Sequence, residues 1–540
     1  MRFTNDFISR SATLLVAACV INVFTFGTTA RAQFVWTGGG GVGDGLWNKN
    51  VNWSGSAPGA NTTNAYVFGG NLTRVELAPN NNLAGMGATS ILFATNATNS
   101  FNLTGNSINM VGGMTNLSTL TQTNSMALVL ATNQVQFATA SNNITLAGVI
   151  SGTGQLVKLG ASTLILTAAN TYTNATVISN GTLQVGNGGT TGSIVGVITN
   201  NASLVYNRSD TITQTNVISG TGSVTKNGSG TLVLATNNTF AGGFTLNTGA
   251  VRAQKGGSFG SGFVTQASGS STVEIDTTET VTNAMSLFNI ATLQTVTLSG
   301  AKTLNGTTYN VASGTTTTES GLLSGAGGLT KTGTGTLSFT ASNSFSGATA
   351  VNAGVLNLNS TTGSALGSTT GLSVASGATL LLSQSGQVND SAAVTLSGGT
   401  IRRGGTVNEV FGNLTVTTGS FLDYGAANGL GTVRFGTYTP SSLLTVQNFL
   451  PGNKLQFGNT LTEAQLNNTS LFSFSSPWTT SIEDGFFTIT AIPEPSTYAA
   501  AAGLLGLMLW PSRRRIIRDA KKILGLRAPM RDRLAARRAS

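Results

Sequence analysis

The sequence predicts an all-β fold in which short strands stack as a parallel β-solenoid. The first observation is a 36-residue unit that aligns with itself three times without a gap, at residues 150–185, 218–253 and 323–358. A repeat of this size indicates stacked architecture, because each unit is too small to bury its own apolar face. The second observation is that each unit contains short β-prone runs bounded by Gly, Ser and Asn, such as 163–167 and 231–235. The 70 glycines supply the positive-φ corners that such turns need.

The three units agree at fixed positions. Each starts with Ser-Gly-x-Gly, and the recurring polar residues are Lys158, Lys226 and Lys331, and Asn170, Asn238 and Asn343. We expect the lysines to mark one corner of each coil, outside the stack, and asparagine to occupy turns or to form ladders between coils. Alternating apolar residues, such as Leu232 and Leu234, are predicted to point into a narrow core. The lysines lie 68 and 105 positions apart, close to two and three periods of about 35, so diverged units are expected between the copies.

These residues carry a family resemblance. The pattern SGTGxxTKxGxGTLxLxxxNTFxGGxTxNxGxL, matched most closely by the second unit, resembles the autotransporter-associated β-strand repeat of large bacterial surface proteins. The resemblance implies a right-handed parallel β-helix displayed outside the cell. It also implies an adhesive or structural role.

Residues 1–32 are predicted to be a signal peptide. A positively charged start precedes the apolar run 12–26, and an Ala-x-Ala motif ends at Ala32, so cleavage is expected before Gln33. An uncleaved membrane helix is one alternative. Lipidation at Cys19, the single cysteine of the chain, is another, although the apolar run continues past that residue.

The mature chain is predicted to have one continuous body in three parts. Residues 33–149 form an N-terminal cap with diverged repeats, 150–454 the repeat-bearing solenoid, and 455–492 a C-terminal cap. The first coil of a solenoid exposes a strand edge and an apolar end, so a cap is physically required. We assign that covering role to Trp36, Trp47 and Trp53. The alternative is that these tryptophans stack on sugar rings.

Residues 493–515 resemble the PEP-CTERM sorting signal of Gram-negative bacteria. The resemblance rests on an apolar run at 498–510 between two short motifs, which are Pro493, Glu494 and Pro495, and Arg513, Arg514 and Arg515. It implies a transmembrane helix and cleavage by an exosortase, a membrane protease. Arginines after the helix place that end in the cytoplasm. Residues 516–540 form a basic cytoplasmic tail, either an amphipathic helix on the inner leaflet or a disordered segment.

The charge distribution argues against nucleic-acid binding. The net charge is +10, but residues 511–540 contribute eleven basic and two acidic residues, and residues 1–32 contribute three basic and one acidic. The remaining 13 basic and 14 acidic residues leave 33–510 near neutral. Basicity at the ends fits membrane topology rather than a nucleic-acid surface.

Catalytic candidates are scarce. The chain has no histidine, and its mature part has no cysteine, which removes most metal sites and most activated nucleophiles. No catalytic, cofactor or metal site is therefore predicted. The best acidic group is Glu274, Asp276 and Glu279, whose first two members would share a strand face at a separation suited to glycoside hydrolysis. Arg402 and Arg403 form an exposed-looking pair that could serve a lyase. A solvated outer face explains both groups equally well.

The sequence thus predicts an exported surface protein that is not an enzyme, with a structural or adhesive role in a biofilm matrix or in cell-surface contact. Its C-terminal helix would hold it in the membrane until processing releases it to the surface. The expected partners are signal peptidase, an exosortase, extracellular polysaccharide and other copies of the chain, with no cofactor. The alternatives are a β-helix polysaccharide lyase or glycoside hydrolase, and a carbohydrate-binding module.

Overall fold

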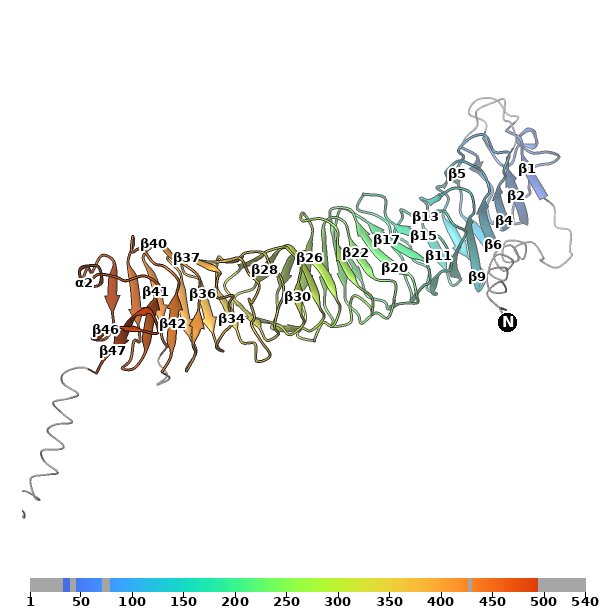
Figure 1. Ribbon diagram of the computed structural model, residues 1–540. Coiled ribbons are helices and arrows are strands. Elements are labelled where there is room, and N and C mark those ends of the chain that lie inside the picture. The colour runs from blue at the N-terminus through green and yellow to red at the C-terminus, as the bar shows by residue number, and fades with distance from the viewer. Residues whose placement is uncertain (1–32, 39–44, 70–77, 426–429, 494–540) are drawn as a thin grey trace, which may run out of the picture. The chain divides into compact units, whose positions relative to one another are not determined.

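The computed structural model describes residues 33–38, 45–69, 78–425 and 430–493. The chain divides into two compact units, Met1–Val273 and Glu274–Ser540. In each unit, successive coils stack so that the strands of one coil pair in parallel with strands one coil further along (Figure 1), and among the described residues only the last strands of the second unit depart from this pattern. The predicted all-β parallel β-solenoid is confirmed.

The targeting segments are not part of this description. The signal peptide, the apolar run 498–510 and the tail 516–540 all lie outside the described residues. Within the described ranges, no helix is both long and apolar enough to cross a membrane.

One coil of the solenoid takes about 20 residues. Val224 pairs with Leu204 in the coil before it and with Phe244 in the coil after it, each 20 positions away. A 36-residue repeat therefore spans slightly less than two coils. The period of about 35 residues inferred from the lysine spacing is not the coil period, because a repeat in sequence need not coincide with one turn of the backbone.

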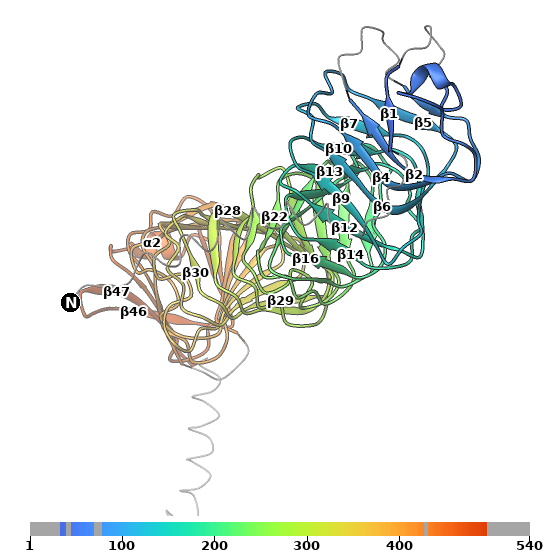
Figure 2. The ribbon, with the colours of Figure 1, turned by 90° about the vertical axis from the view of Figure 1, so that its right-hand side faces the viewer.

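The first unit contains three series of stacked strands (Figure 2). One sheet runs in the order β1 (Gln33–Trp36), β2 (Thr63–Phe68), β4 (Gly87–Phe93), β6 (Ile108–Asn116), β9 (Gln134–Thr139), β12 (Gln155–Leu159), β14 (Thr176–Ile178), β16 (Ile198–Asn200) and β19 (Ile218–Ser219), with β8 (Leu128–Leu130) and β11 (Ile150–Gly152) beside it. A second series comprises β3 (Asn80–Asn81), β5 (Asn102–Gly105), β7 (Gln122–Asn124), β10 (Ile144–Leu146), β13 (Thr163–Leu166), β15 (Thr182–Val185), β17 (Ser203–Asn207), β20 (Ser223–Asn227), β22 (Phe244–Leu246) and β24 (Val264–Gln266). A third series comprises β18 (Ile212–Gln214), β21 (Thr231–Leu234) and β23 (Ala250–Ala253).

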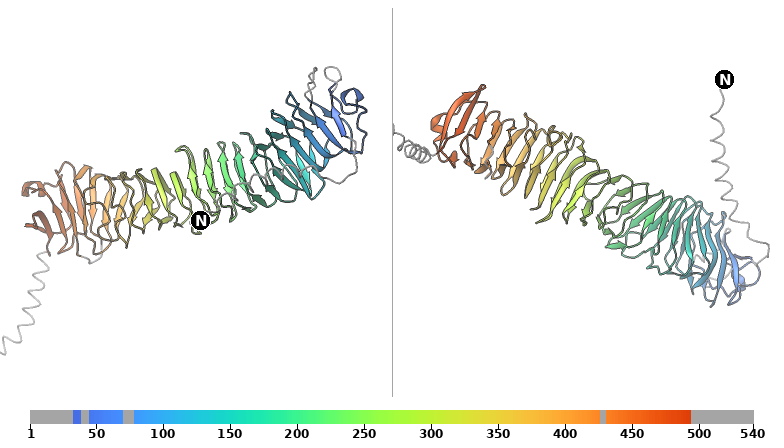
Figure 3. Two further views of the ribbon diagram at one scale, coloured as in Figure 1. Left: turned by 45° about the vertical axis from the view of Figure 1, so that its right-hand side comes forward. Right: turned by 90° about the horizontal axis from the view of Figure 1, so that it is seen from below.

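The second unit repeats this arrangement, seen from two further directions in Figure 3. One face holds β26 (Met285–Thr292), β28 (Lys302–Val311), β30 (Leu323–Ser324), β31 (Leu329–Thr332), β33 (Thr349–Val351), β35 (Gly371–Ala375), β37 (Ala393–Ser397) and β40 (Leu414–Thr418). A second sheet runs in the order β27 (Val296–Leu298), β29 (Thr316–Glu319), β32 (Thr336–Phe339), β34 (Val355–Leu358), β36 (Thr379–Leu382), β38 (Thr400–Arg403), β41 (Ser420–Asp423), β43 (Leu444–Gln447) and β45 (Phe472–Phe474).

The core of each coil comes from the period-two alternation of strands. In β21, Leu232 and Leu234 are fully buried, as predicted, while Thr231 lies on the outer side. Each buried Leu removes enough apolar surface from water to stabilise the fold by roughly 1.5–3 kcal/mol. Because the strands pair in register, apolar side chains of successive coils stack into one continuous core.

The closing glycine of each repeat is required by the backbone. Gly181, Gly249 and Gly354 have φ values of 67°, 73° and 66°. A Cβ at these positions would lie 2.3–2.4 Å from a carbonyl oxygen of the preceding coil. Only glycine combines this conformation with such a close approach.

Aromatic residues close the start of the first unit. Trp36, Trp47 and Trp53 are buried among Tyr66 and Phe68, with ring centroids 5.0 Å apart for the Trp36–Trp53 pair and 4.8 Å for the Trp47–Tyr66 pair. The Trp53 indole nitrogen donates to the Trp47 carbonyl at 2.8 Å. Buried rings offer no face to a sugar, so the alternative of a sugar-stacking platform formed by these three tryptophans is wrong.

The second unit ends in antiparallel strands. Its final sheet contains β39 (Glu409–Val410), β42 (Thr432–Phe435), β44 (Lys454–Phe457), β47 (Phe486–Ala491) and β46 (Trp478–Glu483), in that order. β47 pairs antiparallel with both β44 and β46. The turn between β46 and β47 is Asp484-Gly485, and both residues have positive φ, which matches the twist of a tight hairpin. A reversed strand cannot continue a parallel coil, so the stack stops there.

Candidate functional site

The recurring lysines lie inside the solenoid, which corrects the expectation that they sit outside the stack. Lys158, Lys226 and Lys331 are fully buried. Each Nζ donates to three backbone carbonyls, two from the residues that follow it and one from the next coil. For Lys158 these acceptors are Leu159, Gly160 and Asn180, at 2.8, 2.7 and 2.9 Å. The long lysine side chain points into the solenoid, where its ammonium group donates hydrogen bonds to these corner carbonyls.

The other two lysines repeat this geometry with only small differences. Lys226 donates to the carbonyls of Asn227 and Gly228 at 2.6 and 2.7 Å, and Lys331 donates to those of Thr332 and Gly333 at 2.7 Å each. Burial lowers the pKa of Lys158 to about 7 and the pKa values of Lys226 and Lys331 to about 8. These buried lysines stabilise the coil corner through hydrogen bonds to its carbonyls, and they are not accessible to an external ligand.

The recurring asparagines link three successive coils. The Asn238 side-chain oxygen accepts from the Ile218 amide at 2.8 Å, and its side-chain nitrogen donates to the Ser258 carbonyl at 2.6 Å. Asn170 and Asn343 make the matching pairs of bonds. A side chain with one acceptor and one donor end suits this bridging position. The asparagines are therefore structural as well.

The acidic candidates are divided between a strand and a loop. Glu274 and Asp276 lie half-buried on one face, at the end of β25 (Thr272–Ile275) and just after it, whereas Glu279 is exposed on the following loop. Asp276 accepts a hydrogen bond from Gln294 at 3.4 Å. Within the described residues, no group of three or more His, Cys, Asp or Glu side chains is arranged to hold a metal ion.

The arginine pair is split between surface and core. Arg402 is exposed and forms an ion pair with Asp423 at 2.7 Å. Arg403 is buried, lies 4.7 Å from the centroid of the Tyr424 ring, and donates to Asn453 at 3.0 Å. The expectation of an exposed pair is therefore wrong for Arg403, because neighbouring strand residues face opposite sides of the sheet.

Two buried carboxylates in the second unit were not singled out from the sequence. Glu319 pairs with Lys302 at 2.9 Å and accepts from the Tyr309 hydroxyl at 2.7 Å. Glu409 accepts from the backbone amides of Gln387 and Val388 at 2.8 and 3.0 Å. Burial raises the pKa of Glu319 above its usual range and that of Glu409 to about 7. Both groups are enclosed in the core and hold strands rather than meeting a substrate.

The outer faces of the strands carry aligned hydroxyl groups. On one face of the second unit, strand register places one outward residue per coil in a row of Thr308, Thr330, Ala350, Ser373, Thr395 and Thr415. All are half-buried or exposed. Five of these six residues carry a hydroxyl group, Ala350 being the exception, and neighbouring coils lie about 4.8 Å apart.

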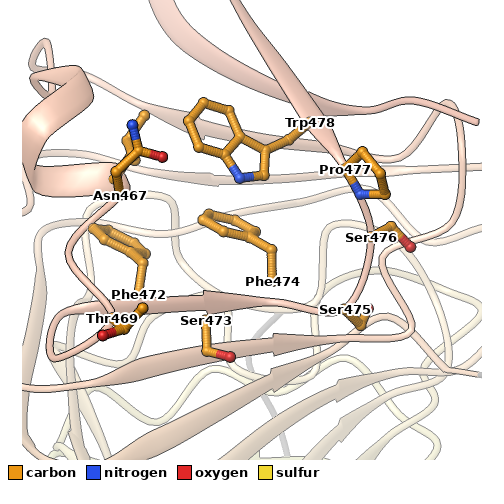
Figure 4. Close-up of a pocket in the computed structure, with 10 residues that line it drawn as sticks. Asn467, Thr469, Phe472, Ser473, Phe474, Ser475, Ser476, Pro477 and Trp478 are labelled. Atoms are coloured by element: carbon orange, nitrogen blue, oxygen red, sulfur yellow. The ribbon is translucent and has the colours of Figure 1, made fainter. Parts of the chain in front are cut away.

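An open cavity lies near the end of the second unit. Its volume is about 450 Å³, and it is lined by Leu466, Asn467, Thr469, Phe472, Ser473, Phe474, Ser475, Ser476, Pro477 and Trp478. These residues come from the short helix α2 (Glu463–Leu466), the edge strand β45 and the start of β46. Figure 4 shows the rings of Phe472 and Phe474 on the same side of β45, with Trp478 facing Phe474. We call this the aromatic pocket.

The aromatic pocket combines ring faces with unengaged polar groups. Phe472 is buried, but Phe474 and Trp478 are only half-buried, and their centroids lie 5.7 Å apart. The side chains of Asn467, Thr469 and Ser476 make no hydrogen bond within the described residues. Sequence reasoning placed this segment in a C-terminal cap and missed the pocket. The alternation Phe-Ser-Phe followed by Trp was the available signal, but only folding brings these residues together with α2.

Comparisons with known proteins agree with the repeat. Residues 156–185, 224–253 and 329–358 match the family model described as the passenger-associated-transport-repeat. The matches end at the same residues as the three units found in the sequence. The chain is also 41% identical, over 101 residues, to a protein named Adhesin BmaC autotransporter from Brucella suis biovar 1 (strain 1330).

That alignment covers 19% of this chain and 3% of the adhesin. No solved structure is significantly similar to the chain. The recognition of autotransporter-associated repeats is confirmed, whereas the sorting signal at 493–515 stays a prediction. The chain therefore contains three segments of the passenger-associated-transport-repeat type within a parallel β-solenoid.

Proposed function

We propose that this chain is an exported bacterial surface protein that acts as a structural or adhesive element. The observation that carries the proposal is the set of three passenger-associated-transport-repeat segments, and the identity of 41% over 101 residues to a protein named as an adhesin autotransporter supports it. The outward row of mostly hydroxyl-bearing residues in the second unit supports it, because a repeated polar face can make many weak contacts whose sum gives strong attachment. Polysaccharide and other copies of the chain are the proposed partners.

The proposed route to the surface rests on the sequence. Signal peptidase would cut before Gln33, and an exosortase would act at the Pro493-Glu494-Pro495 motif while the run 498–510 holds the chain in the membrane. The solenoid would then remain outside the cell.

Deletion of the gene tests the proposal. We expect the deletion strain to attach less well to surfaces or to form a weaker biofilm matrix, and re-expression of the full chain to restore attachment. Purified full-length protein should cleave no polysaccharide. Unchanged attachment, or glycan cleavage that Glu274→Gln or Asp276→Asn abolishes, would contradict the proposal and favour the enzyme alternative.

A further inference from the structure

We propose that the aromatic pocket binds a neutral polysaccharide chain, with Phe474 and Trp478 as the stacking platform. This inference deepens the proposed surface role, on which it rests, by assigning the ligand class and the residues that contact it. The first argument is exposure. The other described tryptophans, Trp36, Trp47 and Trp53, are buried, whereas Trp478 keeps part of its ring at the wall of an open cavity.

The second argument is the pairing of apolar faces with polar groups. A pyranose ring presents C–H groups on its faces and hydroxyls around its edge. An aromatic face attracts the positively polarised C–H groups, and side-chain amides and hydroxyls bond the edge. The pocket supplies both, because Asn467, Thr469 and Ser476 border the rings and use none of their side-chain donors or acceptors within the described structure. Figure 4 shows the Asn467 amide beside the Trp478 ring.

The third argument is charge. None of the ten residues that line the pocket carries a charge. A carboxylated or sulfated glycan would lose solvation on entry without meeting a cation, and this penalty favours an uncharged chain. The openness of the cavity fits an internal stretch of a polymer rather than an enclosed small molecule.

The fourth argument concerns the strand edge. Among the described residues, β45 is the last strand of its sheet and pairs with β43 alone. No further coil of the described part of this unit therefore stacks on β45. The rings of Phe472 and Phe474 are nearly parallel, with an interplanar angle of 8°, and extend the core stack out to this end. The fully buried Phe472 seals the core, while the half-buried pair Phe474 and Trp478 remains for the ligand.

Isothermal titration calorimetry tests the inference with the full-length protein and neutral hexasaccharides, namely cellohexaose, chitohexaose, laminarihexaose and mannohexaose. At least one should bind. Trp478→Ala should weaken that binding by about tenfold or more, since aromatic anchors dominate such interfaces. Asn467→Ala, which leaves the ring packing intact, should weaken it by a smaller factor. Trp478→Phe should retain most of the affinity.

Phe421→Ala is the matched control, because Phe421 is an exposed aromatic residue on the outer side of β41 and is not among the residues that line the pocket. It should leave affinity unchanged. Binding that survives both Trp478→Ala and Asn467→Ala overturns the inference, as does a lack of binding to every hexasaccharide. Attachment assays separate the two proposals. A strain carrying Trp478→Ala that attaches normally while the deletion strain does not would reject the pocket and leave the surface role standing.

Discussion

A buried lysine without an acidic partner defines the repeat at the scale of single residues. Three carbonyl acceptors surround each ammonium of Lys158, Lys226 and Lys331, so the hydrogen-bonding capacity of the group is used completely. Carbonyls at a solenoid corner point along the stack or inward, and a buried acceptor without a donor is costly. In every repeat, one lysine supplies the missing donor to these carbonyls.

Lys226→Met should therefore destabilise the protein. Methionine keeps the length and apolar contacts of the side chain but leaves the carbonyls of Asn227 and Gly228 without the ammonium donor. We expect a loss of about 1–3 kcal/mol in the free energy of unfolding, measured by urea denaturation. Lys49→Met, at an exposed lysine of the same unit, is the control and should change stability by less than about 0.5 kcal/mol. Equal effects of the two substitutions would refute the bracing role.

Glu409 should make stability depend on pH. Burial raises the pKa of this carboxyl to about 7, above its usual value, so the folded state holds the proton more tightly than the unfolded chain does. Its contribution to stability is fully present below about pH 4.5 and is lost as the pH rises through about 7. The free energy of unfolding should therefore fall between pH 5 and pH 7 by roughly 2 kcal/mol on account of this group.

Glu409→Gln should flatten that decline, as followed by urea unfolding at a series of pH values. Part of the slope should persist, because burial also raises the pKa of Glu319. Glu463→Gln removes an exposed carboxylate in α2 and should leave the slope as it is in the parent protein. A Glu409→Gln variant whose stability changes from pH 5 to pH 7 as much as that of the parent protein would show that the Glu409 proton is not retained.

At the scale of elements, strand alternation and the linking asparagine determine different properties of the solenoid. Alternation decides which side chains enter the core, as in β21 with Leu232 inside and Thr231 outside. The asparagine fixes the register of one coil on the next, since Asn238 bonds to the coils on both sides of its own. Together they explain why strands of only three to five residues pair in one register.

Leu232→Asp should disrupt more than its own strand. An unpaired carboxylate in the core would be strongly unfavourable, and the in-register stack passes the damage to β18 and β23, which pair with β21. We expect a destabilisation of at least about 4 kcal/mol and loss of strand signal in circular dichroism. Thr231→Asp places the same charge on the outer side of the same strand. A similar loss of stability in both variants would mean that β21 is not anchored by its inward face.

At the scale of the whole molecule, the chain combines a nearly neutral body with a strongly basic C-terminal segment. Residues 33–510 contain 13 basic and 14 acidic residues, whereas residues 511–540 contain eleven basic and two acidic ones. This asymmetry suits a protein whose body leaves the cytoplasm while its last segment stays at the inner membrane face.

Processing should remove both ends. Intact mass spectrometry of material recovered from the cell surface should show a chain that begins at Gln33 and ends near Pro493–Pro495. In a strain that lacks exosortase activity, the same protein should remain in the membrane fraction with residues 516–540 attached. Surface material from the parent strain that still carries this tail would reject the sorting proposal and indicate a stable membrane protein.

The sequence alone determined the fold class and the repeat. Residue-by-residue agreement over three units, glycine at fixed corners and the period-two pattern of β-prone runs specify a parallel solenoid, because these signals are local. The buried positions of Leu232 and Leu234 followed from the same alternation. The coil period of about 20 residues could not be derived from the sequence repeat, because one repeat spans slightly less than two coils.

Only the tertiary structure decided where polar side chains point. Lys226 has the sequence context of a surface corner, yet its long side chain turns inward because carbonyls from two coils need a donor. Arg402 and Arg403 are neighbours in sequence that end on opposite sides of one strand. The aromatic pocket is lined by residues of α2, β45 and β46, and no local sequence pattern predicts that these elements lie together. Contacts between coils are set by the register of the stack, which is a property of the folded chain.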